Sequence, residues 1–234
     1  MAIANRQFLM SKIIVLMGAP GAGKGTQARL LQQRLGLPQV STGDMFRALA
    51  ETQTPLAEEV RAIQHVGKLI PDELVIRVVE DRTAREDCRN GYILDGFPRT
   101  AAQAEMLEEL AARQRKKMSA ILIDVPRELL EKRMTGRRIC PICKEIYNIY
   151  FQPPTVEGRC DVHREAILEQ RADDTVENVR VRLETYEHKT APLLDYYQRT
   201  GRLHRVDGTQ LPEDIYSEIE KILNTEVVRT SPAN

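Results

Sequence analysis

The 234-residue sequence predicts an α/β fold built on a doubly wound parallel sheet. Short apolar, β-branched runs typical of strands buried on both faces recur along the chain. Each run is followed by a segment whose apolar residues have helical spacing. A glycine-rich turn joins the first run to the first helix. This alternation of strands and helices is characteristic of a parallel sheet covered by helices on both faces.

The core elements follow in this alternating order. KIIVLM (12–17) is predicted to be the first strand, and TQARLLQQRL (26–35) the first helix, in which Ala28, Leu31 and Leu35 lie on one face. The amphipathic segment 175–200 is predicted to be one long helix with a kink near Pro192. The other predicted core elements are strands at 91–97, 120–126 and 203–209 and helices at 104–114, 127–134 and 214–223.

Two segments interrupt this alternation. Residues 41–70 predict two or three short helices and no strand. Residues 136–173 contain cysteines, aromatic residues and the turn-rich stretch QPPTVEG, which predict a small β-rich insert. The predicted organisation is therefore a core made of 1–40, 71–135 and 174–234, with a helical insert at 41–70 and a β-rich insert at 136–173.

Composition argues against several classes of protein. Lysine plus arginine and aspartate plus glutamate number 34 each, so the net charge is zero and a general nucleic-acid or membrane-surface binder is not expected. No segment approaches the ~18 consecutive apolar residues of a membrane span. Lys12 interrupts the apolar stretch near the N-terminus, which disfavours a secretory signal. We expect a cytoplasmic protein.

The stretch GAPGAGKGTQA, which begins at Gly18, predicts a phosphate-binding loop. Glycines let successive backbone N–H groups point into one concavity in front of a helix, and Lys24 supplies a cation for the outer phosphates. The strict pattern requires a hydroxyl where this chain has Gly25, and that hydroxyl normally ligates Mg²⁺. Either Thr26 reaches the phosphates instead, or Mg²⁺ is held mostly by phosphate oxygens and water, with Asp95 near that water shell.

Arginines recur at the ends of the predicted elements, where α/β sheets bind their ligands. Phosphoryl transfer depends on positioning and on stabilising negative charge, so it requires several cations at one place. The candidates are Arg47, Arg99, Arg133, Arg137, Arg171 and Arg182.

The cysteines predict a structural zinc site. Cys140 and Cys143 form one C-x-x-C pair, and after residues 144–159 comes the C-x-x-H pair of Cys160 and His163. Two such pairs are typical of tetrahedral Zn²⁺, and four protein ligands leave no open position for chemistry. Asp161 is an alternative fourth ligand, and a metal-free hairpin with reduced cysteines is the alternative for the whole segment.

Taken together, the motifs resemble the adenylate kinase family. GAPGAGKGTQA, STGDMFR, GKLIPDELV, GYILDGFPRT, GRR and QRADD occur in the family's order and spacing, from residue 12 to about residue 223. GKGT is the family's own form of the loop. The resemblance implies a P-loop kinase core with an AMP-binding insert and a lid. It implies a monomer that catalyses ATP + AMP = 2 ADP with Mg²⁺ and maintains the adenine nucleotide pool. Some members carry zinc in the lid with Cys or Asp as the fourth ligand, so His163 is a departure.

The resemblance also implies a role for individual residues. The residues implied for ATP are Gly21, Ala22, Gly23, Lys24, Gly25, Thr26, Arg133, Arg137, Ile146, Tyr147 and Gln210. The residues implied for AMP are Thr42, Arg47, Lys68, Leu69, Ile70, Gly96, Phe97, Pro98, Arg99, Gln103, Arg171 and Arg182, with Gln103 reading the adenine edge. The residues implied for catalysis are Lys24, Asp95, Arg99, Arg133, Arg137, Arg171 and Arg182.

Other functions remain as alternatives. A GTP:AMP phosphotransferase shares most of these motifs, although that form usually lacks the cysteines. A kinase for UMP or CMP is disfavoured by Thr42 together with Gln103. A zinc-ribbon nucleic-acid binder on an inactive kinase core is disfavoured by the zero net charge and by the intact Lys24 and arginines. A switch GTPase is disfavoured because no N-K-x-D motif is present.

Overall fold

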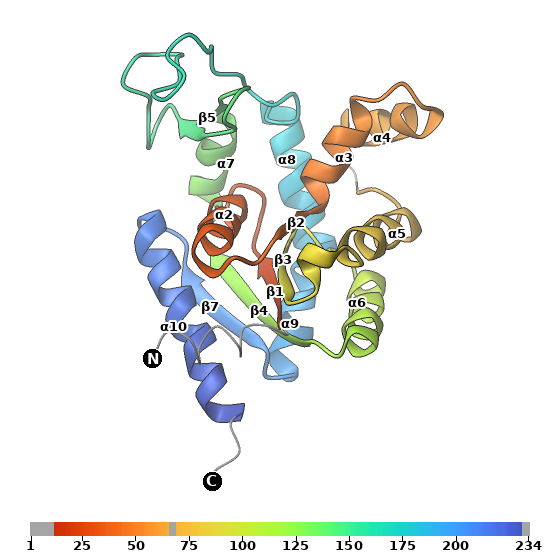
Figure 1. The fold of residues 1–234 in the computed structure, drawn as a ribbon. Helices are drawn as coiled ribbons and strands as arrows, with labels where there is room; N and C mark the ends of the chain where they lie inside the picture. The colour runs from red at the N-terminus through yellow and green to blue at the C-terminus, as the bar shows by residue number, and fades with distance from the viewer. Residues whose placement is uncertain (1–11, 66–68, 231–234) are drawn as a thin grey trace.

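A five-stranded parallel sheet forms the centre of the protein in the computed structural model, which describes residues 12–65 and 69–230 (Figure 1). The strand order is β2-β3-β1-β4-β7, so the chain extends first to one side of β1 and then to the other. This order confirms the predicted doubly wound sheet, and it places the ligand crevice at the carboxyl end of β1. The strands are β1 (Lys12–Met17), β2 (Gln39–Ser41), β3 (Gly91–Asp95), β4 (Lys117–Asp124) and β7 (Leu203–Asp207).

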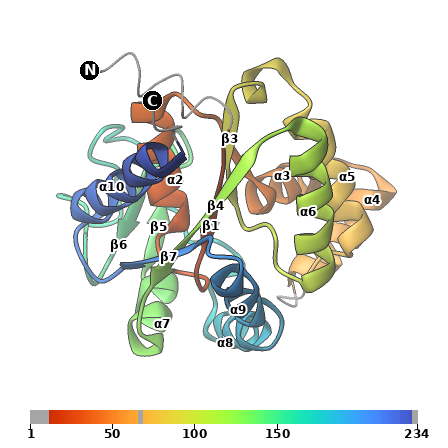
Figure 2. The same ribbon diagram turned by 90° about the horizontal axis from the view of Figure 1, so that it is seen from below.

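Helices cover both faces of this sheet. Figure 2 shows α2 and α10 on one side of the strands and α5 and α6 on the other. The helices are α2 (Lys24–Leu35), α3 (Thr42–Ala50), α4 (Pro55–His65), α5 (Asp72–Thr83), α6 (Ala101–Gln114), α7 (Arg127–Thr135), α8 (Val176–Thr185), α9 (Pro192–Arg199) and α10 (Pro212–Thr230), with a 3-10 turn at Glu86–Cys88.

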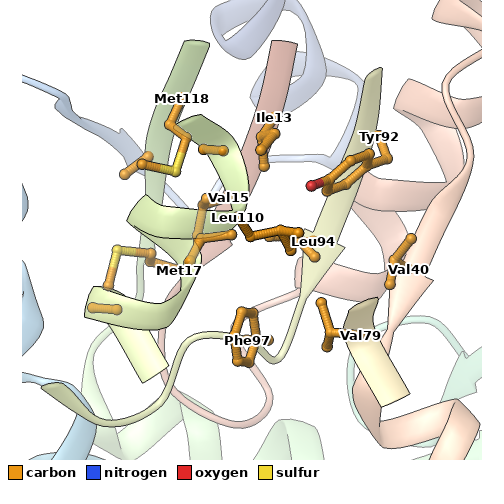
Figure 3. Close-up of a cluster of buried hydrophobic side chains, with 14 of the residues drawn as sticks. Ile13, Val15, Met17, Val40, Val79, Tyr92, Leu94, Phe97, Leu110 and Met118 are labelled. Atoms are coloured by element: carbon orange, nitrogen blue, oxygen red, sulfur yellow. The ribbon is translucent and has the colours of Figure 1, made fainter. Parts of the chain in front are cut away.

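The period of two along each strand divides the core between the faces. Every residue of β1 is buried, and Ile14 and Leu16 pack in one cluster with residues of α2, α7, α8 and α10. Ile13, Val15 and Met17 point into the opposite cluster, with residues of α5, α6 and α9 (Figure 3). Because both faces of the sheet are covered, the central strands are continuous apolar runs.

Three elements differ from the sequence-based expectation. The strand β2 and the helix α5 were not predicted, because a three-residue strand gives no measurable alternation and α5 follows the short helices without a strand between them. The helix predicted over 175–200, with a kink near Pro192, is divided into α8 and α9 by a π-helical turn at Tyr186–Thr190, just before that proline.

Both inserts project from the same end of the core (Figure 1). The first contains α3 and α4, as predicted for 41–70. The second contains the antiparallel pair β5 (Arg137–Ile139) and β6 (Ile146–Asn148) and has a small buried cluster of its own around Cys140 and Cys160. Within the described residues, no helix combines the length and apolar composition needed to cross a membrane.

Candidate functional site

The glycine-rich loop lies at the carboxyl end of β1 and leads directly into α2. Gly18, Gly21 and Gly23 have φ angles of 137°, 84° and 101°, in the region that favours glycine. A Cβ atom on Gly18 would lie only 2.6 Å from the backbone oxygen of Ile123, so this position has no room for a side chain. Since α2 begins at Lys24, its unpaired N–H groups face the loop. This geometry is suited to phosphate oxygens.

Lys24 folds back over the loop. Its Nζ donates to the backbone oxygens of Gly18 at 2.8 Å and Ala19 at 2.9 Å. Loss of hydration lowers the pKa of Lys24 to about 8; the nearby Asp95 carboxylate opposes this shift, and neighbouring arginines add to it. The amine is therefore held at the loop by neutral carbonyl oxygens. Phosphate oxygens would supply the negative charge that these partners lack.

Asp95 is the last residue of β3 and faces the start of α2. Its Oδ2 accepts a hydrogen bond from Gln39 Nε2 at 3.2 Å, and it lies 3.5 Å from the position of a Cβ atom built on Gly25. Thr26 is half-buried one residue further along α2. The structure thus places a carboxylate beside the loop at the point where the usual hydroxyl is missing.

Two acidic residues hold two of the predicted arginines together. Arg137 bonds Asp174 through Nε at 2.8 Å and Nη2 at 2.6 Å. Arg182 Nη1 lies 3.1 Å from Asp174 Oδ1 and 3.0 Å from Asp173 Oδ2. Asp174 is fully buried. Both acids lie in the stretch QRADD, but neither was predicted to be a site residue; their adjacency in a motif that also contains Arg171 is the signal that could have identified them.

The remaining positive charge is only partly neutralised. The pKa of Arg171 is lowered to about 10, first by loss of hydration and then by the charges of Arg137 and Arg47. The pKa of Arg99 is also lowered, mainly by loss of hydration and by the charge of Arg182. Loss of hydration is the main cause of both shifts, and repulsion among the clustered cations of the site adds to it. Such a site is complementary to a polyanion.

A pocket opens beside these arginines, between the first insert and β3. Thr42 Oγ1 donates to the Gly96 oxygen at 2.9 Å, and Arg99 Nε donates to the same oxygen at 2.7 Å. Arg47, whose guanidinium bonds Asp44, reaches the pocket from α3. The lining residues are Thr42, Gly43, Phe46, Arg47, Leu69, Ile70, Val75, Gly96, Arg99, Gln103, Asp173 and Arg182.

The pocket therefore contains most residues implied for AMP. Phe97 is buried in the core, the Phe97–Pro98 peptide bond is cis, and neither residue is among those that line the pocket. Arg171 does not line the pocket, but its charge interacts with that of Arg47, which does. Lys68 lies outside the described residues.

The residues implied for the ATP nucleoside are spread over the second insert and the last turn. Arg133 lies at the end of α7 and is half-buried, which lowers its pKa. Ile146 is half-buried on β6, whereas the hydroxyl of its neighbour Tyr147 lies 3.6 Å from the Sγ of Cys160. Gln210 is exposed in the turn after β7. The nucleoside roles of these residues stay predictions.

The four predicted zinc ligands meet at one point in the second insert. The sulfur atoms of Cys143 and Cys160 are 3.7 Å apart. His163 Nδ1 is buried and has no hydrogen-bond partner within the described part of the chain, as expected for a nitrogen that ligates a metal. The Asp161 carboxylate instead accepts from the backbone N–H of Thr155 at 2.8 Å. Ligand atoms lying within 4.8 Å of one another come from Cys140, Cys143, Cys160 and His163.

Comparisons with known proteins agree with this geometry. Residues 16–202 match the family described as adenylate kinase. An adenylate kinase from Clostridium perfringens (strain SM101) is 48% identical over 214 residues, which cover 91% of this chain and 99% of the relative. An adenylate kinase from Gloeobacter violaceus is 49% identical over 219 residues, which cover 92% of this chain and 100% of the relative. One from Clostridium botulinum (strain Loch Maree) is 46% identical over 211 residues, covering 90% and 97%.

Proposed function

Because this chain belongs to the adenylate kinase family and catalyses reversible phosphoryl transfer, ATP + AMP = 2 ADP, we propose that the glycine loop binds ATP and the adjacent pocket binds AMP. The observation that supports this assignment is the clustering of cationic side chains where the two meet. Lys24 lies at the loop, Arg99 lines the pocket, and the pKa of each is lowered by lost hydration and by neighbouring cations.

The reaction requires positioning and charge stabilisation rather than a nucleophilic side chain. An AMP phosphate oxygen attacks the γ-phosphorus of ATP, a P–O bond forms, and the bond between that phosphorus and the bridging oxygen of ADP breaks. We assign the transferred group to Lys24, Arg133, Arg137, Arg171 and Arg182. The phosphate of AMP is assigned to Arg47 and Arg99.

The two inserts are proposed to close over the nucleotides. In this assignment residues 41–70 form the AMP-binding insert, 136–173 form the lid, and the rest of the chain is the core. Closure would exclude the water that otherwise hydrolyses ATP. Arg137 at the base of the lid and Arg182 on α8 already share Asp174, which gives the lid a fixed attachment to the core.

Adenylate kinases use Mg²⁺ with ATP. We propose that the ion is held largely through phosphate oxygens and water, with Asp95 bonding that water shell. The carboxylate of Asp95 lies close to Gly25, which fits this arrangement. When bound, Mg²⁺ neutralises negative charge on the phosphates.

A coupled assay tests the nucleotide assignment. ATP and GTP are compared as donors, and AMP, GMP, CMP and UMP as acceptors. We expect the highest kcat/KM for ATP with AMP. A preference for GTP would replace the donor assignment, and no turnover with any pair would favour an inactive kinase core.

ATP affinity is expected to fall as the pH rises through about 8. In the protein without nucleotide the pKa of Lys24 is about 8. Bound phosphates favour the charged amine, so the pKa of Lys24 is higher in the complex with ATP. Between these two pKa values binding takes up a proton, and each pH unit weakens binding by up to about tenfold. Calorimetric titration at about pH 7 and about pH 9 measures this effect. Lys24→Arg keeps its charge at both pH values. The same pH dependence in both proteins would contradict the assignment.

We propose that Cys140, Cys143, Cys160 and His163 hold one structural Zn²⁺. The support is the convergence of their ligand atoms, the unpartnered buried Nδ1 of His163, and the engagement of Asp161 elsewhere. The second insert has only a small buried cluster of its own, so metal binding would contribute much of its folding free energy.

The purified protein is expected to contain about one zinc per chain. Cys143→Ala should lower the melting temperature, chiefly by unfolding the lid, while activity at low temperature largely persists because four protein ligands leave no position for substrate. Elemental analysis of protein made without a metal-affinity tag measures the zinc. Cys88→Ala is the matched control for zinc content, because Cys88 lies in the core away from the cluster. Metal-free protein of undiminished stability contradicts the zinc site.

We also propose that the protein is a cytoplasmic monomer that does not bind nucleic acid and serves adenine nucleotide homeostasis. Its balanced charge supports the absence of nucleic-acid binding.

A further inference from the structure

Gln103, the residue assigned to the adenine edge, is held from behind by Asp72. Gln103 Nε2 donates to Asp72 Oδ1 at 2.6 Å, and Gln103 Oε1 accepts from the backbone N–H of Arg99 at 2.8 Å. Gln103 is only 2% exposed, and Asp72 is half-buried at the first position of α5. The contact with Asp72 joins the first position of α5 to the first turn of α6, 31 residues further along the chain.

Asp72 is itself held in position. Thr100 Oγ1 donates to Asp72 Oδ2 at 2.9 Å and accepts from the backbone N–H of Gln103 at 3.2 Å, as the N-cap of α6. Each oxygen of the carboxylate therefore has a donor. Rotation of the carboxylate away from Gln103 would break the bond to Thr100.

The chemistry of these partners allows only one orientation of the Gln103 amide. An ionised carboxylate only accepts hydrogen bonds, and the backbone N–H of Arg99 only donates. A flipped amide would place its oxygen against the Asp72 carboxylate and its NH₂ against the N–H of Arg99. Both bonds would be lost, and like groups would face each other where little water can enter.

The fixed orientation leaves one amide N–H and one oxygen lone pair of Gln103 for the pocket. Adenine offers an acceptor at N1 and a donor at the N6 amino group, which match that N–H and that lone pair in fixed order. Guanine offers the reverse, an acceptor at O6 and a donor at N1. A freely rotating amide would serve either base by flipping.

We propose that Asp72 determines the specificity for adenine over guanine at the acceptor site, by preventing the flip of Gln103. This inference rests on the proposed function, namely on the pocket being the AMP site. Asp72 acts as a positioning residue: it orients the amide and need not touch the nucleotide.

Asp72→Asn tests the proposal, because an asparagine of the same shape both donates and accepts, so that only the backbone N–H of Arg99 still opposes the flipped amide. The ratio of kcat/KM for AMP to that for GMP, with ATP as donor, is expected to fall by roughly tenfold or more, as for a lost bond to a charged group. Loss of the negative charge alone would change both substrates equally, since their phosphates are the same. Asp72→Ser, whose hydroxyl also donates and accepts, is the second variant and should lower the ratio as well.

Asp81→Asn is the matched control. Asp81 lies on the same helix, and its carboxylate is exposed beside Arg85, so its removal should leave the ratio unchanged. Asp72→Asn is also made in a Gln103→Ala background, where it should have no further effect on the ratio if it acts through the amide. A wild-type ratio in both folded Asp72 variants overturns the proposal, as does an equal effect with Gln103 absent. Failure of the wild type to prefer AMP would instead contradict the assignment of the pocket.

Discussion

Lys24→Met is expected to lower kcat by roughly 10²–10³, because it removes one preorganised cation from the developing charge on the transferred phosphoryl group. Methionine keeps most of the apolar stem, and although it loses the two hydrogen bonds of Nζ to the loop, the positive φ angles of the loop glycines remain. The fold should therefore persist. Steady-state kinetics with ATP and AMP measure the loss, and circular dichroism verifies the fold.

The control for this variant is Lys132→Met on the exposed side of α7. It removes the same charge from the surface and should change kcat little. If folded Lys24→Met turns over near the wild-type rate, Lys24 has no part in the transfer and the excess charge at the site must act through the arginines alone.

Asp174→Asn is expected to lower the free energy of unfolding by about 3–5 kcal/mol, the usual cost of removing one partner from a buried ion pair. Asp174 is fully buried and bonds both Arg137 and Arg182, whose side chains are only 15% and 19% exposed. The asparagine keeps the shape but removes the charge partner of Arg137 and leaves Arg182 with Asp173 alone. Urea denaturation monitored by circular dichroism measures the change.

Asp124→Asn is the matched substitution at the surface. Asp124 is 62% exposed and lies 3.5 Å from Arg205, so its loss should cost less than about 1 kcal/mol. Equal effects of the two substitutions would show that Asp174 is not a buried structural charge. A ligand with several phosphates should restore part of the stability of Asp174→Asn, since it would supply the missing negative charge.

Local sequence was sufficient wherever a function depends on neighbouring residues. The glycine loop, Lys24 and the start of α2 lie within a few positions of one another, so the phosphate site is visible as a motif. The same holds for the pairs Cys140/Cys143 and Cys160/His163. The buried strands were predictable because burial on both faces produces a continuous apolar run.

Only the tertiary structure decided which acids support these groups. Asp72 meets Gln103, and Asp174 meets Arg137, across more than thirty residues of chain. Nothing in the local pattern distinguishes these carboxylates from solvated ones, because their significance arises from burial and from the donors that surround them.

The elements that sequence reasoning missed have the same cause. The strand β2 is three residues long and is a strand only because β3 lies beside it. The π-helical turn at Tyr186–Thr190 contains Thr190, whose hydroxyl donates to the backbone oxygen of Arg99 at 3.0 Å. Sequence by itself determined the core strands, the glycine-rich loop and the two Cys/His pairs, since each depends on contiguous residues. Packing between distant segments decided the pocket, the acids Asp72 and Asp174 that hold its side chains, and the contact between the π-helical turn and Arg99. Those contacts exist only after the chain has folded.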